Sequence, residues 1–245
     1  MTLRAPTILA MGGGGFSEGL DPQLDRYLLA LTGRDDPRVC FVPTATGDSD
    51  RYIVRFYNAF QNAGCRPSHL PLFARRHVGQ ALRDFVLAQD LIYVGGGNTA
   101  NLLAVWRLHG LDEILTQAWR EGVILAGLSA GSLCWFEGGV TDSFGASLQP
   151  LSDGLGLLPG SHCPHYDSEA GRRPSYTRLV ASGTLPPGYA ADDGVALRFT
   201  GTTLTEVVSG RPGGQAWHVT PDSKAENGAR HEALDVKPLA RGGST

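Results

Sequence analysis

The segment Ala126-Gly127-Leu128-Ser129-Ala130-Gly131-Ser132 has residue types that suit nucleophilic catalysis by a serine. Its G-x-S-x-G form is the pattern of a nucleophile elbow, in which a serine sits on a sharp strand-to-helix turn. The small neighbours let the chain fold back and leave the Ser129 hydroxyl exposed. The backbone N–H of Ala130, at the start of the expected helix, is placed to receive an oxyanion. Ordinary turns of small residues share this pattern, so the rest of the chain must support it.

A second segment with the character of a site is Tyr93-Val94-Gly95-Gly96-Gly97-Asn98-Thr99, which follows an apolar run and precedes a helical pattern. Open parallel sheets collect their ligand-binding loops at this end of their strands. The loop lacks both G-x-G-x-x-G and Gly-Lys-Ser/Thr, the usual phosphate-binding fingerprints. It therefore favours an oxyanion-hole loop. Gly12 to Gly15, after the first expected strand, are given a weaker supporting role at the rim of the cleft.

A serine nucleophile needs a base, and two histidines compete for that role. His165 follows Pro164, which restricts the local backbone and would help to hold an imidazole in position, so His165 is preferred over His162. A metal site is the alternative for this segment, with ligands from His162, Cys163, His165 and Asp167. These residues are too crowded along one strand or loop to converge on a tetrahedral ion. We therefore predict no metal, and the proposed chemistry implies no cofactor.

Short apolar runs alternate with longer amphipathic stretches, which predicts a parallel sheet with helices on both faces. The expected strands are residues 7–11, 39–42, 69–72, 91–94 and 123–126, and the expected helices are residues 21–31, 51–62, 79–88 and 99–120, the last broken near His109-Gly110. Beyond Cys134, strand-like runs at 195–199 and 203–208 and a helix at 173–181 are expected to complete the sheet edge and the site. The polar tail from Pro221 onward promises no burial.

Bulk composition sets limits on the function. The chain has 245 residues, of which 42% are hydrophobic and 18% are charged, as in an ordinary globular domain. A net charge of −3 with scattered basic residues argues against a nucleic-acid partner. The first apolar run is too short for a signal peptide or a membrane span, which predicts a cytoplasmic protein with no membrane partner. Four widely spaced cysteines without a C-x-x-C pair suit reduced thiols.

The G-G-G-N-T loop at 95–99, the G-x-S-A-G elbow at 127–131 and the segment Pro164-His165-Tyr166 resemble the peptidase E family, which includes aspartyl dipeptidases and is related to cyanophycinase. The resemblance implies a flavodoxin-like, class I glutamine amidotransferase-like α/β fold, a three-layer sandwich with a mostly parallel sheet. Chain length and composition predict a single domain over 1–245, and the polar segment at 220–245 predicts a loosely packed tail. The resemblance also implies a serine peptidase that hydrolyses dipeptides or short peptides, typically with N-terminal aspartate, as a monomer or homodimer.

Carried over to this chain, the resemblance assigns a catalytic triad of Ser129, His165 and Asp193, with oxyanion donors at the backbone N–H groups of Gly97 and Ala130. Asp193 stands where the family usually has a glutamate before a glycine. A shorter carboxylate can still accept the imidazole N–H and select its tautomer. Asp142 is the alternative acid.

Arg173 matches the arginine that the family associates with aspartate preference, since a planar guanidinium can hold a carboxylate through two hydrogen bonds. Gly96 and Asn98 complete the expected substrate-binding set. Pro174, where the family tends to have a polar helical residue, departs from its pattern, as does aspartate in place of glutamate at position 193.

Two other functions fit parts of the sequence. An α/β-hydrolase esterase would use Asp142 as its acid and His218 or His231 as its base, but the G-G-G-N-T loop argues against it. A non-catalytic protein could keep the cleft and hold an acidic small molecule at Arg173. Labelling of Ser129 by a fluorophosphonate separates these possibilities, because it requires an activated hydroxyl.

Overall fold

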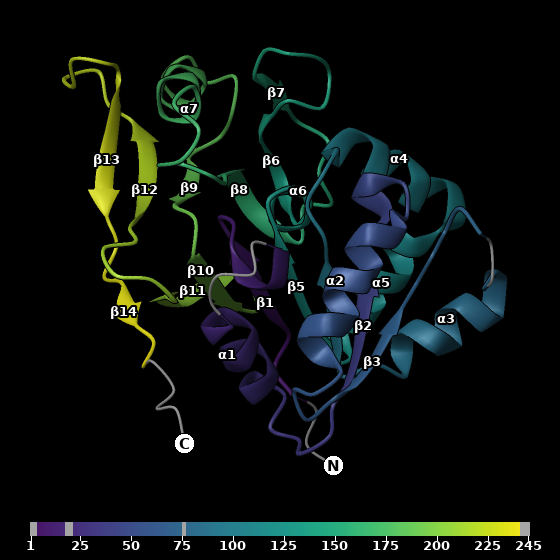
Figure 1. Cartoon of the computed structure of the whole chain (residues 1–245). Helices are drawn as coiled ribbons and strands as arrows, with labels where there is room; N and C mark the ends of the chain where they lie inside the picture. The colour runs from purple at the N-terminus through teal and green to yellow at the C-terminus, as the bar shows by residue number, and fades with distance from the viewer. Residues whose placement is uncertain (1–3, 18–21, 75–76, 241–245) are drawn as a thin grey trace.

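The computed structural model describes residues 4–17, 22–74 and 77–240, and its strands form two sheets (Figure 1). The larger sheet has the order β14-β11-β10-β1-β5-β4-β2-β3. Its strands β1, β5, β4, β2 and β3 run parallel, and β10 and β11 extend it in antiparallel fashion beyond β1. The bounds are β1 (Thr7–Met11), β2 (Arg38–Val42), β3 (Arg66–His69), β4 (Leu91–Val94), β5 (Ile124–Leu128), β10 (Val195–Thr200), β11 (Thr203–Ser209) and β14 (Lys237–Pro238).

Helices cover both faces of this sheet, as the sequence predicts. Adjacent residues of β1 point to opposite faces, so Leu9 and Met11 belong to one apolar core and Ile8 and Ala10 to another. The first core includes residues of α1 (Gln23–Leu31) and α2 (Asp50–Phe60). The second includes residues of α3 (Gly79–Leu87), α4 (Thr99–His109) and α5 (Leu111–Arg120). The α/β fold class is thereby confirmed, and the helical pattern at 99–120 is indeed broken at Gly110.

One predicted strand lies elsewhere than expected. The apolar run at 69–72 predicts a strand there, whereas β3 spans Arg66–His69. Within the described chain, β3 pairs only with β2, so it is an edge strand and its side chains stay partly exposed. Leu70 and Leu72, which suggested the strand, are buried in the segment that follows it.

The second half of the chain adds a sheet that the sequence did not indicate. Its order is β13-β12-β9-β8-β6-β7, and α7 (Arg172–Ala181) packs on it (Figure 1). The bounds are β6 (Phe136–Thr141), β7 (Gln149–Leu151), β8 (Leu158–Cys163), β9 (Gly188–Ala191), β12 (Ala216–Pro221) and β13 (Ala229–Ala233). The expected polar tail thus contains β13, paired with β12, and β14, paired with β11. Strand pairing uses backbone groups, so polar side chains did not prevent it.

Two further observations concern the described residues alone. None of their helices is long and apolar enough to cross a membrane. Cys40, Cys65, Cys134 and Cys163 are all free thiols, and the first, third and fourth are buried.

Phe56→Ala is expected to lower the free energy of unfolding by about 3–5 kcal/mol, as for other large aromatic truncations in cores. Phe56 is 0% exposed, and its ring stacks on Phe41 and Phe60 at centroid distances of 4.9 and 4.7 Å. Urea denaturation measures the change. Val54 on the same helix is 56% exposed, so Val54→Ala should change the unfolding free energy by less than about 0.5 kcal/mol. Equal effects of both changes would contradict the packing of α2.

Candidate active site

Ser129 lies on the turn between β5 and the short helix α6 (Ala130–Leu133). Its backbone has φ 54° and ψ −118°, a conformation that costs a non-glycine residue about 1–3 kcal/mol. Ser129 N–H donates to the Met11 carbonyl at 3.2 Å, and the Ser129 carbonyl accepts from Leu133 N–H at 2.9 Å. A Cβ on Gly131 would lie 2.7 Å from the Val94 carbonyl carbon. The chain thus has the strained turn and the small neighbour that the elbow pattern predicts.

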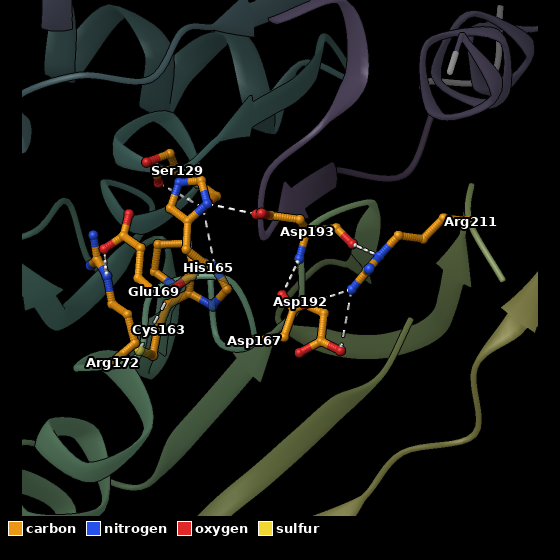
Figure 2. Close-up of polar contacts among 12 residues, drawn as sticks. Ser129, Cys163, His165, Asp167, Glu169, Arg172, Asp192, Asp193 and Arg211 are labelled. Atoms are coloured by element: carbon orange, nitrogen blue, oxygen red, sulfur yellow. Dashed lines mark hydrogen bonds and ion pairs between the residues drawn. The ribbon is translucent and has the colours of Figure 1, made fainter. Parts of the chain in front are cut away.

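His165 and Asp193 form a hydrogen-bonded pair beside this turn. His165 Nδ1 lies 2.6 Å from Asp193 Oδ1, and the His165 ring lies between Ser129 and Asp193 (Figure 2). An ionised carboxylate can only accept, so Nδ1 carries the proton and Nε2 keeps its lone pair. His165 has φ 54°, and its N–H donates to the Gly12 carbonyl at 3.1 Å.

The two adjacent aspartates have opposite pKa shifts. Burial works to raise the pKa of Asp193, but hydrogen bonds from His165 and Ser168, together with the charges of His165 and Arg211, outweigh it and lower the pKa. Burial raises the pKa of Asp192 to about 6, and the nearby charges of Asp167 and Asp193 add to the effect. Environments that separate the pKa values of neighbouring acids are typical of active sites. Asp193 is therefore the aspartate kept ionised beside the imidazole.

Asp167 and Arg211 form hydrogen bonds with the backbone of Asp193 (Figure 2). Asp193 N–H donates to Asp167 Oδ1 at 3.0 Å, and its carbonyl accepts from Arg211 Nε at 2.5 Å. Arg211 Nη2 also pairs with Asp167 and lies 3.6 Å from Asp192 Oδ2. The sequence did not indicate Arg211, because it is 44 residues from Asp167 and belongs to no local motif.

The glycines after β1 pack directly against the His165–Asp193 pair. The Gly13 carbonyl accepts from Gly194 N–H at 3.1 Å. A Cβ on Gly13 would overlap the Asp193 carboxylate and lie 2.9 Å from His165 Cε1. The sequence analysis predicted only a weak role for these glycines at the rim, whereas the structure places Gly13 in contact range of both side chains.

Two backbone N–H groups near Ser129 are available to an oxyanion. Among the described residues, neither Gly97 N–H nor Ala130 N–H has a hydrogen-bond acceptor. Gly96 lies close as well, since a Cβ there would be 3.2 Å from Ser129 Cβ, and its N–H donates to Tyr52 Oη at 3.2 Å. Asn98 instead caps α4, because its Oδ1 accepts from Asn101 N–H at 2.8 Å and its Nδ2 donates to the Ser143 carbonyl at 3.0 Å.

A cavity of about 410 Å³ opens over the elbow. Ser129 and His165 both line it, but within the described chain the Ser129 hydroxyl forms no hydrogen bond to His165. Catalytic hydrogen bonds are often long before substrate binds. The described lining residues come from five segments and include no carboxylate: Ser17, Thr46, Ser49, Arg51, Tyr52, Arg55, Gly96, Gly97, Leu128, Ser129 and His165.

Arg173, the expected carboxylate-binding residue, does not line this cavity. Its guanidinium lies over the rings of Tyr166 and Trp217, 5.4 and 5.0 Å from their centroids. It borders a different cavity, beside α7, together with Arg178 and His231. The arginines over the elbow are Arg51 and Arg55 of α2, which the sequence analysis did not single out.

The other candidate acids and bases lie away from the elbow cavity. His162 is buried in β8, with Nε2 3.0 Å from Ser132 Oγ and Nδ1 3.1 Å from the Tyr189 carbonyl, and burial lowers its pKa to about 3. Asp142 is exposed in the turn after β6. His218 packs against Tyr189, and His231 lies 2.7 Å from Tyr166 Oη. In the described chain, no group of three or more His, Cys, Asp or Glu side chains could hold a metal ion.

The chain is similar to known peptidases in sequence and in fold. The profile of peptidase family S51 matches residues 8–207 of the chain. An uncharacterized peptidase, YgaJ, of Bacillus subtilis is 54% identical over 232 residues, which is 94% of this chain and 95% of that one. Peptidase E of Streptomyces coelicolor is 34% identical over 130 residues, or 53% of this chain and 51% of that one. The crystal structure of a peptidase from an acI-B1 Actinobacterium shares the fold, with a TM-score of 0.72 at 19% identity over 95% of both chains.

Proposed function

Because the chain belongs to peptidase family S51 and is therefore a peptidase, we propose that it cleaves short peptides by a serine mechanism, with Ser129 as nucleophile. In this proposal His165 is the general base and Asp193 orients it. The observation that supports it most is that Ser129, with its strained backbone, lines one cavity together with His165, whose Nδ1 lies 2.6 Å from Asp193 Oδ1.

The mechanism follows from the positions of these groups. His165 Nε2 takes the Ser129 proton as Oγ attacks the peptide carbonyl, and the N–H groups of Gly97 and Ala130 stabilise the oxyanion. The C–N bond then breaks, and the imidazolium gives its proton to the departing amine. Water, deprotonated by His165, next hydrolyses the acyl-enzyme and releases Ser129. Asp193 stays ionised throughout and stabilises the imidazolium.

The substrates we propose are dipeptides and short peptides, among them peptides with N-terminal aspartate. A cavity of about 410 Å³ is near the small end for ligand sites, which run from about 300 to 1,000 Å³. It accommodates a short peptide better than a folded protein. The relatives named peptidase E support peptide hydrolysis as the reaction.

Two measurements on the same preparation test the proposal. A fluorophosphonate should label the protein, and mass spectrometry should place the label on Ser129. A panel of dipeptides and tripeptides, including several with N-terminal aspartate, should be hydrolysed. Labelling without hydrolysis of any peptide, but with hydrolysis of simple esters, would favour an esterase. The absence of both labelling and turnover would favour a binding protein and would refute the serine mechanism.

Gly13→Ala is expected to lower kcat by about a hundredfold, the effect of displacing catalytic groups by about 1 Å. The added methyl group would push Asp193 and His165 out of register. Gly171→Ala is the matched control, because its backbone is αR and its Cβ would meet only the Leu148 side chain, at 3.2 Å. Peptide hydrolysis and thermal melting should be measured for both. Equal kcat values for the two variants would show that Gly13 does not support the pair.

A further inference from the structure

Helix α2 forms one wall of the elbow cavity. Arg51, Tyr52 and Arg55 of this helix line the cavity together with Ser49, which precedes the helix. Tyr52 joins α2 to the glycine loop at 95–97, since its hydroxyl accepts from Gly96 N–H at 3.2 Å. Side chains of α2 therefore share one cavity with Ser129 and His165.

Two positive charges lie on this wall, and among the described residues no carboxylate compensates them. Arg51 and Arg55 are four residues apart, so their side chains occupy the same face of α2. Both are exposed, and neither forms an ion pair with any acid in the described chain. Arg55 Nη1 makes one hydrogen bond, to the Ser17 carbonyl at 3.3 Å. Like charges at this spacing weaken a helix, and the described residues of the lining include no carboxylate to offset them.

We infer that Arg51 and Arg55 bind a carboxylate group of the peptide substrate, so that α2 selects the peptides that Ser129 cleaves. The inference rests on the proposed peptidase function. Guanidinium groups recognise carboxylates through paired, charge-assisted hydrogen bonds. The position of Arg173 supports the assignment, because it stacks on Tyr166 and Trp217 in another cavity and leaves this role to α2.

The bound carboxylate is either an acidic side chain or the free C-terminus of the peptide. Four dipeptides distinguish these sources: Asp-Leu, Asn-Leu and the C-terminal amide of each. Binding is measured by calorimetry with Ser129→Ala protein, which removes the nucleophile and prevents turnover. The same series is then measured with Ser129→Ala protein that also carries Arg51→Gln and Arg55→Gln.

We expect Ser129→Ala protein to bind Asp-Leu about 10- to 100-fold more tightly than the peptide that lacks the recognised carboxylate. The protein that also carries the two arginine changes should bind both peptides equally. Weaker binding of Asn-Leu would identify an acidic side chain, and weaker binding of Asp-Leu amide would identify the C-terminus. Arg120→Gln, at the exposed end of α5 and outside the cavity, removes one charge and should leave the preference unchanged.

The inference would be overturned if the preference survived loss of both arginines, or if Ser129→Ala protein showed no preference among the four peptides. Turnover of the same peptides by protein with intact Ser129 separates this inference from the proposed function. Cleavage that remains equally selective without the arginines would refute the carboxylate site alone. A preference that disappears with the arginines, in a protein that cleaves no peptide and takes no fluorophosphonate label, would refute the serine mechanism and leave the carboxylate site standing.

Discussion

Ser129→Ala is expected to lower kcat for peptide hydrolysis by about 10⁴- to 10⁶-fold, the range found when serine nucleophiles are removed. We expect this large loss because Ser129 is the serine on the strained turn, with φ 54° immediately before α6. Alanine lacks the hydroxyl but leaves the backbone bonds from Ser129 N–H to Met11 and from Leu133 to the Ser129 carbonyl in place. Circular dichroism and thermal melting should therefore match wild type.

The control for this variant is Ser152→Ala, which removes a hydroxyl from an exposed loop. It should hydrolyse peptides at the wild-type rate and take the fluorophosphonate label. If Ser129→Ala kept more than about a hundredth of wild-type kcat, its activity would be well above that expected after loss of the nucleophile. Ser129 could then not be the attacking group. Loss of secondary structure in Ser129→Ala would instead show that the substitution acts through folding.

Several residues of the candidate site can be predicted from local sequence motifs. Ser129, Gly97 and Ala130 lie within two short segments at the carboxyl ends of neighbouring strands, β4 and β5. Their mutual position follows from the parallel sheet, which the alternation of apolar and amphipathic segments predicts. For this reason the strand-to-helix turn at Ser129 and the loop at 95–99 could be predicted from sequence, as could the boundaries of β1 and β4.

The residues that sequence reasoning missed depend on contacts between distant segments. Arg211 reaches Asp193 only because the segment after β11 lies beside that after β9, and no pattern near Arg211 indicates this. Gly13, for which the sequence analysis predicted only a supporting role at the rim, packs against the side chains of Asp193 and His165, which follow it by well over a hundred residues. Arg51 and Arg55 are exposed residues of an amphipathic helix, a position that by itself indicates no site. Their function depends on what faces α2, and helical periodicity does not report that.

The second sheet was missed for a related reason. Its strands contain glycine, proline and polar residues, as in Leu158–Cys163, so they lack a continuous apolar run. Such strands form because neighbours supply backbone partners, for example Ser161↔Gly188 between β8 and β9. This sheet determines the site, since His165 follows β8 and Asp193 follows β9. The parallel pairing of β8 with β9 therefore brings His165 and Asp193 together.

Asp193→Asn is expected to lower kcat by about 10⁴-fold while substrate binding changes little, as when the triad aspartate of a serine protease is replaced. The Asp193 carboxylate accepts from His165 Nδ1 at 2.6 Å and so keeps the lone pair on Nε2. An asparagine amide can donate to Nδ1 instead, and the imidazole then carries its proton on Nε2. That tautomer cannot accept the Ser129 proton.

Asp142→Asn is the matched control, because Asp142 is the other acid that the sequence offered. It is exposed after β6, whereas Asp193 is held by Asp167 and Arg211. Kinetics of peptide hydrolysis should show wild-type kcat for Asp142→Asn and the large loss for Asp193→Asn. The reverse result would transfer the role of triad acid to Asp142 and would require His165 to leave the partner it has in this structure.

Asp193→Glu should keep part of the activity that Asp193→Asn loses, since glutamate keeps the acceptor, but its extra methylene must fit against Gly13. Partial rescue by glutamate with no rescue by asparagine would show that the charge and acceptor at this position, rather than its volume, support catalysis.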